Sequence, residues 1–302
     1  MEKPVFCGLF FLPHAMRRFL PLLCLSAALC SFENPGPGPK RPAGLVYAWQ
    51  TQPGPSSQTL AARFAVPAGC QRLPVAAGSW GEWLRYLPLM PAGTKARLYN
   101  GGLKNRQDVV AAVADIDVGA KDLQQCADAV IRLRAEYMFS HDPNKVHFHL
   151  TTGYDFWFSD FVAGKTFKVV KEEVLPATRP AEAPTHAALG RYLLPTFGYA
   201  GTKSLSRELR PVPLPQVQPG DVLVHGGAPG HAVLVVDVAE HPVTHQKYVL
   251  LAQSYMPAQN IHVLRNVDAP ALGAWFALPG LMETEFDTPE WTFGRDEVKR
   301  FE

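Results

Sequence analysis

The sequence predicts an α+β fold in which an antiparallel sheet packs against one long helix that carries Cys126. Two segments rich in Val, Leu and Ala, 220–237 and 247–253, are bounded by Gly and polar residues, as buried strands usually are. A glycine-rich turn inside the first segment and a polar connection between the two predict hairpins. Between Lys121 and about Ser140, apolar residues recur at helical spacing, which predicts the helix.

Composition limits the classes of function. The 302 residues include enough apolar side chains for one large domain or two modest ones. The formal net charge is +2 and charged residues are spread along the chain, so a basic footprint for nucleic acid is missing. The ten histidines are scattered, with neither HExxH nor CxxC spacing. We therefore expect no metal site, no cofactor and no nucleic-acid partner.

The first 30 residues have the build of a signal peptide region. Arg17 and Arg18 precede an apolar stretch that ends in small residues and is too short for a spanning helix. Translation from Met16 is a hypothesis that N-terminal sequencing of the precursor would test. Cleavage after Ala28 is expected, and cleavage before a lipidated Cys30, which would tether the protein to a membrane, is the alternative. We expect an exported protein, periplasmic or associated with the envelope.

Residues 31–58 are rich in Pro, Gly and Ser and predict a linker, with one apolar contact expected at 45–47. A single globular α+β domain is expected over residues 59–302, and no internal repeat occurs in it. This division assigns all the candidate chemistry to one domain.

Further elements of the domain follow in chain order. Ser79 is expected to cap a short helix that ends at Pro88. The aromatic segment 154–161 is expected to pack in the core or under a lid rather than to bind a ligand. The remaining expected elements are strands at 96–99, 146–152 and 261–264, an apolar stretch at 109–117, and a helix from Thr185 to Leu194 with a kinked continuation past Pro195.

Cys126 lies in the first turns of the predicted long helix, on the face that packs. A helix N-terminus and a nearby imidazole lower the pKa of a thiol and make it a nucleophile. Two other roles remain open. Cys126 is either a buried structural thiol or the disulfide partner of Cys70, the other cysteine of the mature domain.

His231 stands at the mouth of the second strand of the hairpin. If the hairpin folds about residue 242, His231 lies opposite Gln253. Its imidazole is then the candidate base, and the amide oxygen of Gln253 accepts the imidazole N–H, as the third member of a triad does. Gln125 and the backbone N–H of Cys126 are the candidate donors to an oxyanion. The alternative is a histidine that merely caps a strand.

The order of these motifs resembles the NlpC-type and CHAP-type cysteine hydrolases of the papain-like superfamily. In them a helix presents the cysteine, a Gly-Asp strand precedes a Gly-His strand, and the next strand ends in a polar residue. The matching residues here are Gln125-Cys126-Ala127, Gly220-Asp221, Gly230-His231 and Gln253. The resemblance implies a papain-like core with an N-terminal extension, and cleavage of peptidoglycan peptides or related amides.

A closer resemblance, over roughly residues 60–302, is to an exported bacterial family known as domain of unknown function 4846. Five runs carry it: 116–119, 122–137, 229–233, 251–259 and 288–293. The family implies one globular unit and no assigned reaction.

Three hypotheses follow. The first is an exported cysteine amidase or peptidase that acts on a cell-wall peptide or a related amide, with Cys126 as nucleophile. The second is a non-catalytic envelope protein that binds through the aromatic segment 154–161. The third is a structural domain held by a Cys70–Cys126 disulfide, which would remove the nucleophile.

Overall fold

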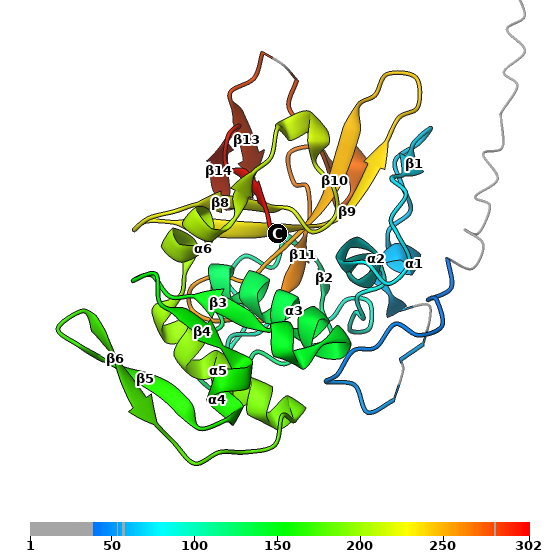
Figure 1. Ribbon diagram of the computed structural model, residues 1–302. Coiled ribbons are helices and arrows are strands. Elements are labelled where there is room, and N and C mark those ends of the chain that lie inside the picture. The colour runs from blue at the N-terminus through cyan, green and yellow to red at the C-terminus, as the bar shows by residue number, and fades with distance from the viewer. Residues whose placement is uncertain (1–38, 53, 56–57, 281) are drawn as a thin grey trace, which may run out of the picture. The chain divides into compact units, whose positions relative to one another are not determined.

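The computed structural model describes residues 39–52, 54–55, 58–280 and 282–302, which lie in one compact unit (Figure 1). The predicted signal peptide, its cleavage site and the lipidation of Cys30 lie outside these residues. Part of the expected linker packs on the domain, since the side chains of Leu45 and Tyr47 are buried and the Tyr47 hydroxyl donates to the Trp83 carbonyl at 2.8 Å. The apolar contact expected at 45–47 is therefore present.

A nine-stranded sheet forms the centre of the described part of the chain, and all its paired strands are antiparallel. The order is β2-β11-β10-β9-β8-β15-β7, and β1 also pairs with β9 and β12 with β10. The strands are β1 (Gln71–Arg72), β2 (Val110–Val113), β7 (Arg210–Pro211), β8 (Val222–His225), β9 (His231–Glu240), β10 (Lys247–Gln253), β11 (His262–Leu264), β12 (Trp275–Ala277) and β15 (Val298–Arg300).

Three two-stranded sheets and six α-helices complete the described residues. The small sheets are β3 (His147–His149) with β4 (Asp155–Trp157), β5 (Lys165–Val170) with β6 (Glu173–Thr178), and β13 (Glu285–Thr288) with β14 (Trp291–Gly294). The helices are α1 (Leu60–Arg63), α2 (Trp80–Arg85), α3 (Cys126–His141), α4 (Phe158–Val162), α5 (His186–Tyr199) and α6 (Thr202–Glu208). The predicted α+β class, with its antiparallel sheet and a long helix carrying Cys126, is confirmed.

Both faces of the main sheet are covered, which explains why β9 and β10 read as continuous apolar runs. Alternate side chains of β9 enter different cores because successive residues of a strand point to opposite faces. Ala232 and Leu234 share a core with Val130 of α3, whereas Val233 shares one with Phe293 of β14. In Figure 1 the β13–β14 hairpin lies at the top, and α4 and α5 lie at the bottom.

A buried ion cluster joins β9 to the N-terminal elements. The carboxylate of Asp237 is fully buried and lies 2.6 Å from Arg72 Nε of β1 and 2.8 Å from Arg85 Nη2 of α2. A buried charge is tolerated when it is paired and hydrogen-bonded. The pairing fixes α2 against the strand that carries His231. Ser79 caps α2 as predicted, because its side chain accepts from the Glu82 N–H.

The aromatic segment 154–161 packs mainly inside the domain. Phe156, Phe158 and Phe161 are buried and contact Tyr192 of α5, while Trp157 is partly exposed and stacks on His147 with ring centroids 4.0 Å apart. The segment therefore belongs mainly to the core, as predicted.

Two predicted elements were wrong. The long helix begins at Cys126 rather than at Lys121, because Gln125 takes the N-cap position in extended conformation. The expected strand at 96–99 makes only isolated bridges, Arg97 with Leu103 and Leu98 with Gln259. The continuation expected past Pro195 is present, since α5 runs through Tyr199 with Pro195 inside it.

Candidate functional site

Cys126 is the first residue of α3, so its thiol lies where a helix presents N–H groups without intrahelical partners. The Asp128 carboxyl, two residues on, accepts the N–H of Gln125 at 3.0 Å and secures this end of the helix. Cys126 is partly exposed. The new boundary puts the thiol in the turn over which the helix dipole acts.

The thiol also lies beside a backbone N–H of the sheet, that of Ala232, which no neighbouring strand accepts. Val235 exchanges hydrogen bonds with Gly220 and Asp221, both 2.8 Å long, so the backbone N–H of Ala232 must point the other way, toward β10. Because Ala252 pairs with Leu234, β10 ends one position short of Ala232. The N–H of Ala232 interacts instead with Cys126. The end of β10 therefore makes room for the thiol within the sheet.

His231 and Gln253 meet as predicted, but in another register. His231 Nε2 lies 2.9 Å from Gln253 Oε1. The predicted pairing of His231 directly opposite Gln253 was wrong: β9 and β10 are offset by two residues, with a bulge at Leu250–Leu251. A shift of two residues keeps a side chain on the same face, so the two residues still meet as diagonal neighbours.

Two residues that were not predicted from the sequence, Glu290 and Lys104, extend this pair. Glu290 Oε2 accepts from Gln253 Nε2 at 2.6 Å, and Glu290 Oε1 lies 2.7 Å from Lys104 Nζ. Both side chains are largely buried, with 10% and 5% of their surface exposed. Glu290 lies in the run 288–293 that helped carry the family resemblance, which was an available signal. Nothing in the local sequence marks Lys104.

Aromatic rings surround the imidazole of His231. The ring centroids of Tyr255, Trp291 and Phe293 lie 5.0, 5.5 and 6.0 Å from that of His231. Lys104 Nζ lies 5.4 Å from the centroid of Tyr255. This apolar enclosure governs the electrostatics of the site.

Burial sets the protonation of both candidate groups. It lowers the pKa of His231, an effect that the hydrogen bond with Gln253 opposes. It raises the pKa of the Cys126 thiol, which the N–H groups of Ala232 and Ala127 oppose. Neutral imidazole and neutral thiol are thus favoured together.

The side chain of Gln125 is hydrogen-bonded within the protein. Its side-chain amide donates to Asp122 Oδ1 at 3.2 Å, and the same oxygen accepts the N–H of Ala258 at 2.6 Å. In this conformation Gln125 ties the start of α3 to the loop after β10.

Cys70 and Cys126 are both free thiols. Cys70 directly precedes β1, where Gln71 pairs with Glu240 at the far end of β9, whereas Cys126 lies beside Ala232 at its beginning. Eight residues of strand separate the two positions, or about 26 Å at ~3.3 Å per residue. A disulfide needs Cα atoms within about 7 Å, so the disulfide hypothesis was wrong.

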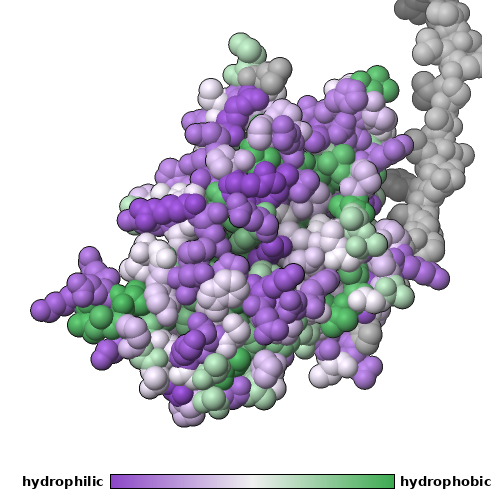
Figure 2. All heavy atoms as spheres, viewed as in Figure 1, coloured by the Kyte–Doolittle hydropathy of each residue, from purple (hydrophilic) through white to green (hydrophobic). Residues whose placement is uncertain are grey.

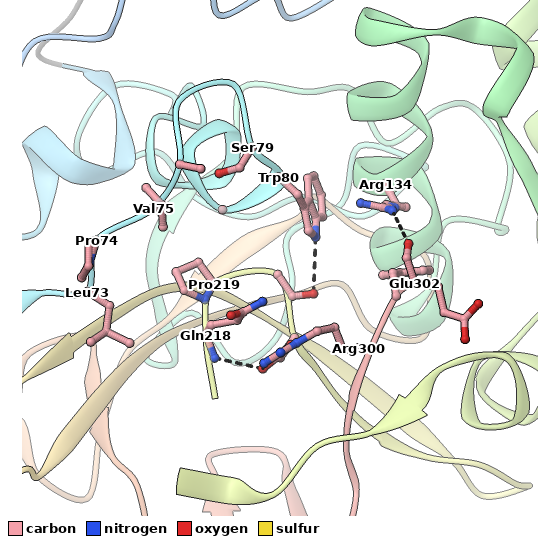
Figure 3. A pocket seen from close by; sticks show the side chains of 15 residues that line it. Leu73, Pro74, Val75, Ser79, Trp80, Arg134, Gln218, Pro219, Arg300 and Glu302 are labelled. Carbon is pink, nitrogen blue, oxygen red and sulfur yellow. Dashed lines mark hydrogen bonds and ion pairs between the residues drawn. The ribbon is translucent and has the colours of Figure 1, made fainter. Parts of the chain in front are cut away.

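A cavity of about 530 Å³ lies elsewhere, between the start of α2, α3 and the C-terminal strand. Figure 3 shows Trp80, Arg134 and Arg300 around it. Arg134 is eight residues beyond Cys126, ~12 Å along the helix. None of the residues that line this cavity belongs to the Cys126–His231 cluster. Figure 2 shows a mainly hydrophilic surface with scattered apolar residues on the face in view.

Two further findings concern metals and membranes. Within the described ranges, no group of three or more His, Cys, Asp or Glu side chains is arranged to hold a metal ion. Of the helices described, none combines the length and the apolar character needed to cross a bilayer.

Comparison with known proteins gives one family. The domain of unknown function 4846 matches residues 60–300. No curated protein and no solved structure matches the chain. The matched range covers the sheet, α3 and every residue of the candidate site, and the chain belongs to the family of domain of unknown function 4846.

Proposed function

We propose that the protein is an exported cysteine-dependent amidase or peptidase that acts on cell-wall peptides or a related amide. One observation carries the proposal. Cys126 is the first residue of α3 and lies beside the first residues of β9, where His231 is already paired with Gln253. A nucleophile, a base and a group that orients the base are the parts that covalent amide hydrolysis needs.

In the first half of the reaction, Cys126 Sγ attacks the carbonyl carbon of the amide and its proton passes to His231. The C–S bond forms as the carbonyl becomes an oxyanion, for which the N–H of Cys126 at the helix start is a suitable donor. Collapse of this intermediate breaks the C–N bond, and His231 returns the proton to the leaving amine. A thioester remains on Cys126.

In the second half, His231 takes a proton from water, and the resulting hydroxyl attacks the thioester carbon. The C–S bond breaks, the proton returns to the sulfur, and a carboxylic acid leaves. Atoms and charges balance without a cofactor. The hydrogen bond between Gln253 and His231 would keep the ring oriented through both halves.

The protonation states of Cys126 and His231 in the resting protein define the state from which the reaction starts. Since burial raises the pKa of Cys126 and lowers that of His231, the proposed enzyme starts from a neutral pair and not from a thiolate–imidazolium pair. Proton transfer then accompanies attack, as in general-base catalysis. A papain-like, NlpC-type core is the scaffold that we propose for this arrangement, with export by the N-terminal presequence.

Thiol alkylation against pH tests the proposal directly. The rate at Cys126 should fall when His231 is replaced by alanine, and Cys70→Ser should leave it unchanged because Cys70 lies at the other end of β9. A Cys126 rate that is independent of His231 would refute the catalytic pair.

An assay of peptidoglycan hydrolysis is the second test of the proposed function. Purified protein incubated with peptidoglycan sacculi should release new amino groups, and Cys126→Ser should abolish the release while Cys70→Ser does not. If alkylation depends on His231 but sacculi stay intact, cell-wall peptides are the wrong substrate and the thiol chemistry stands.

A second candidate is a non-catalytic binding protein. A cavity of about 470 Å³ lined by Tyr137, His147 and Trp157, among others, favours it. Binding of peptidoglycan fragments that survives Cys126→Ser and is lost in Trp157→Ala would support this function in place of catalysis.

A further inference from the structure

Four side chains form one hydrogen-bonded series that ends on the imidazole of His231. Lys104 Nζ lies 2.7 Å from Glu290 Oε1, Glu290 Oε2 lies 2.6 Å from Gln253 Nε2, and Gln253 Oε1 lies 2.9 Å from His231 Nε2. Lys104 comes from the loop before β2, and Glu290 from the turn between β13 and β14. The series thus joins three distant parts of the chain.

The chemistry of each group fixes the direction of every hydrogen bond. An ammonium group only donates and a carboxylate only accepts. Glu290 therefore requires the NH₂ end of the Gln253 amide, and the amide oxygen must then face His231. An oxygen without hydrogen only accepts, so His231 Nε2 must carry the proton.

The other ring nitrogen is left with a lone pair. A neutral imidazole carries one proton, so a protonated Nε2 leaves Nδ1 as the acceptor. Among the residues that the structure describes, His231 Nδ1 has no hydrogen-bond partner, and it is not sealed from solvent. It is free to take a proton.

We propose that Glu290, held by Lys104, is a positioning residue that sets the Gln253 amide and thereby commits His231 to the tautomer with Nδ1 as base. The consequence for catalysis rests on the proposed function, whereas the tautomer is a property of the resting protein. The two statements therefore fail separately.

The series is well protected. The side chains of Lys104 and Glu290 are 5% and 10% exposed, and Gln253 and His231 are each 1% exposed. Water therefore has little access to offer Gln253 another partner. A buried polar group without a partner costs ~1–3 kcal/mol, which opposes an isolated flip of the amide.

The substitution Glu290→Gln should invert the series. Lys104 still needs an acceptor, so the introduced amide would turn its oxygen to Lys104 and its NH₂ to Gln253. Gln253 would then present its own NH₂ to His231, and Nε2 would become the acceptor. The proton would move to Nδ1, the nitrogen proposed as base.

Nitrogen-15 NMR of the imidazole at neutral pH measures the tautomer of His231 directly. The wild type should show a protonated Nε2 and a bare Nδ1 for His231, assigned by loss of the signal in His231→Asn. The variant Glu290→Gln should show the reverse. The matched control Glu285→Gln, an exposed carboxyl on the same hairpin, should keep the wild-type tautomer.

The alkylation rate of Cys126 tests whether the tautomer of His231 affects the reactivity of the thiol. Loss of a positioned base removes about 10²–10⁴-fold in rate, so Glu290→Gln should lose most of the His231-dependent rate and Glu285→Gln none. A protonated Nδ1 in the wild type, or an unchanged tautomer in Glu290→Gln, would overturn the positioning role. The wild-type spectrum decides even if the variant does not fold. The expected tautomers combined with a rate independent of His231 would instead overturn the proposed function alone.

Discussion

Asp128 offers a prediction that joins the stability of the fold to the chemistry of its site. Its carboxyl is buried in the first turn of α3, and burial raises its pKa from 3.8 to about 8. Oδ2 accepts the N–H of Gln125, whereas Oδ1 is buried without a hydrogen-bond partner among the described residues. We predict that Asp128→Asn stabilises the protein increasingly as the pH rises.

The magnitude follows from the two protonation states. A rise from 3.8 to about 8 amounts to roughly 6 kcal/mol against the charged form, at ~1.4 kcal/mol per pKa unit. The helix dipole favours a carboxylate here by only ~0.3–2 kcal/mol, so burial dominates. Between the two pKa values the unfolded chain is ionised and the folded protein is protonated. Stability therefore falls with pH by about 1.4 kcal/mol per unit.

Equilibrium urea unfolding at pH 5 and pH 7 measures the effect. Asparagine keeps the oxygen that accepts from Gln125 and cannot ionise, so the stability difference between Asp128→Asn and wild type should grow by about 3 kcal/mol over these two units. Asp268→Asn, at an exposed carboxyl, should show no such growth. A difference between Asp128→Asn and wild type that is constant with pH would mean that Asp128 is ionised in the folded protein, and would refute the reasoning.

Two other predictions test the surroundings of the site. Burial lowers the pKa of His262 from 6.5 to about 4. The contribution of neutral His262 to the free energy of unfolding should therefore be present above pH 6.5 and be lost, by ~3 kcal/mol, as the pH falls to 4. Urea unfolding of His262→Asn should lack this loss. A Cβ at Gly230 would lie 2.6 Å from the Gly227 carbonyl oxygen and 2.9 Å from that of His225, so Gly230→Ala should destabilise by ~1–3 kcal/mol. Gly190→Ala, at an open position in α5, should instead stabilise by ~0.5–1 kcal/mol, and equal shifts in their urea midpoints would contradict the steric argument.

The sheet and the helix could be predicted because their signals are local. The apolar runs of β9 and β10 and the helical spacing after Cys126 reflect burial of whole elements, which composition reveals. The run Gln125-Cys126-Ala127 was also the part of the motif order that located the candidate nucleophile. The start of α3 was misplaced because Leu123 continues the apolar spacing, while the extended backbone of Gln125 interrupts the helix without Gly or Pro.

The partners of His231 could be predicted only in part. Gln253 was found from the hairpin, since an error of two residues in register does not change the face of a strand. Glu290 and Lys104 lie far from His231 in sequence, and neither follows from hydrophobic spacing. Contacts of this kind depend on how the β13–β14 hairpin and the loop before β2 fold onto the sheet, which local patterns do not encode.

The location of the candidate site follows from the unequal ends of two neighbouring strands. β9 begins with the sharp turn at Gly230, and β10 stops at Gln253, so the N–H of Ala232 lacks a strand partner where α3 starts. An unpartnered N–H in a sheet is costly when buried, and the Cys126 sulfur is the polar atom that meets it. An extra paired residue at the end of β10 would take the N–H of Ala232, so the early end of this strand is a structural condition for its contact with Cys126.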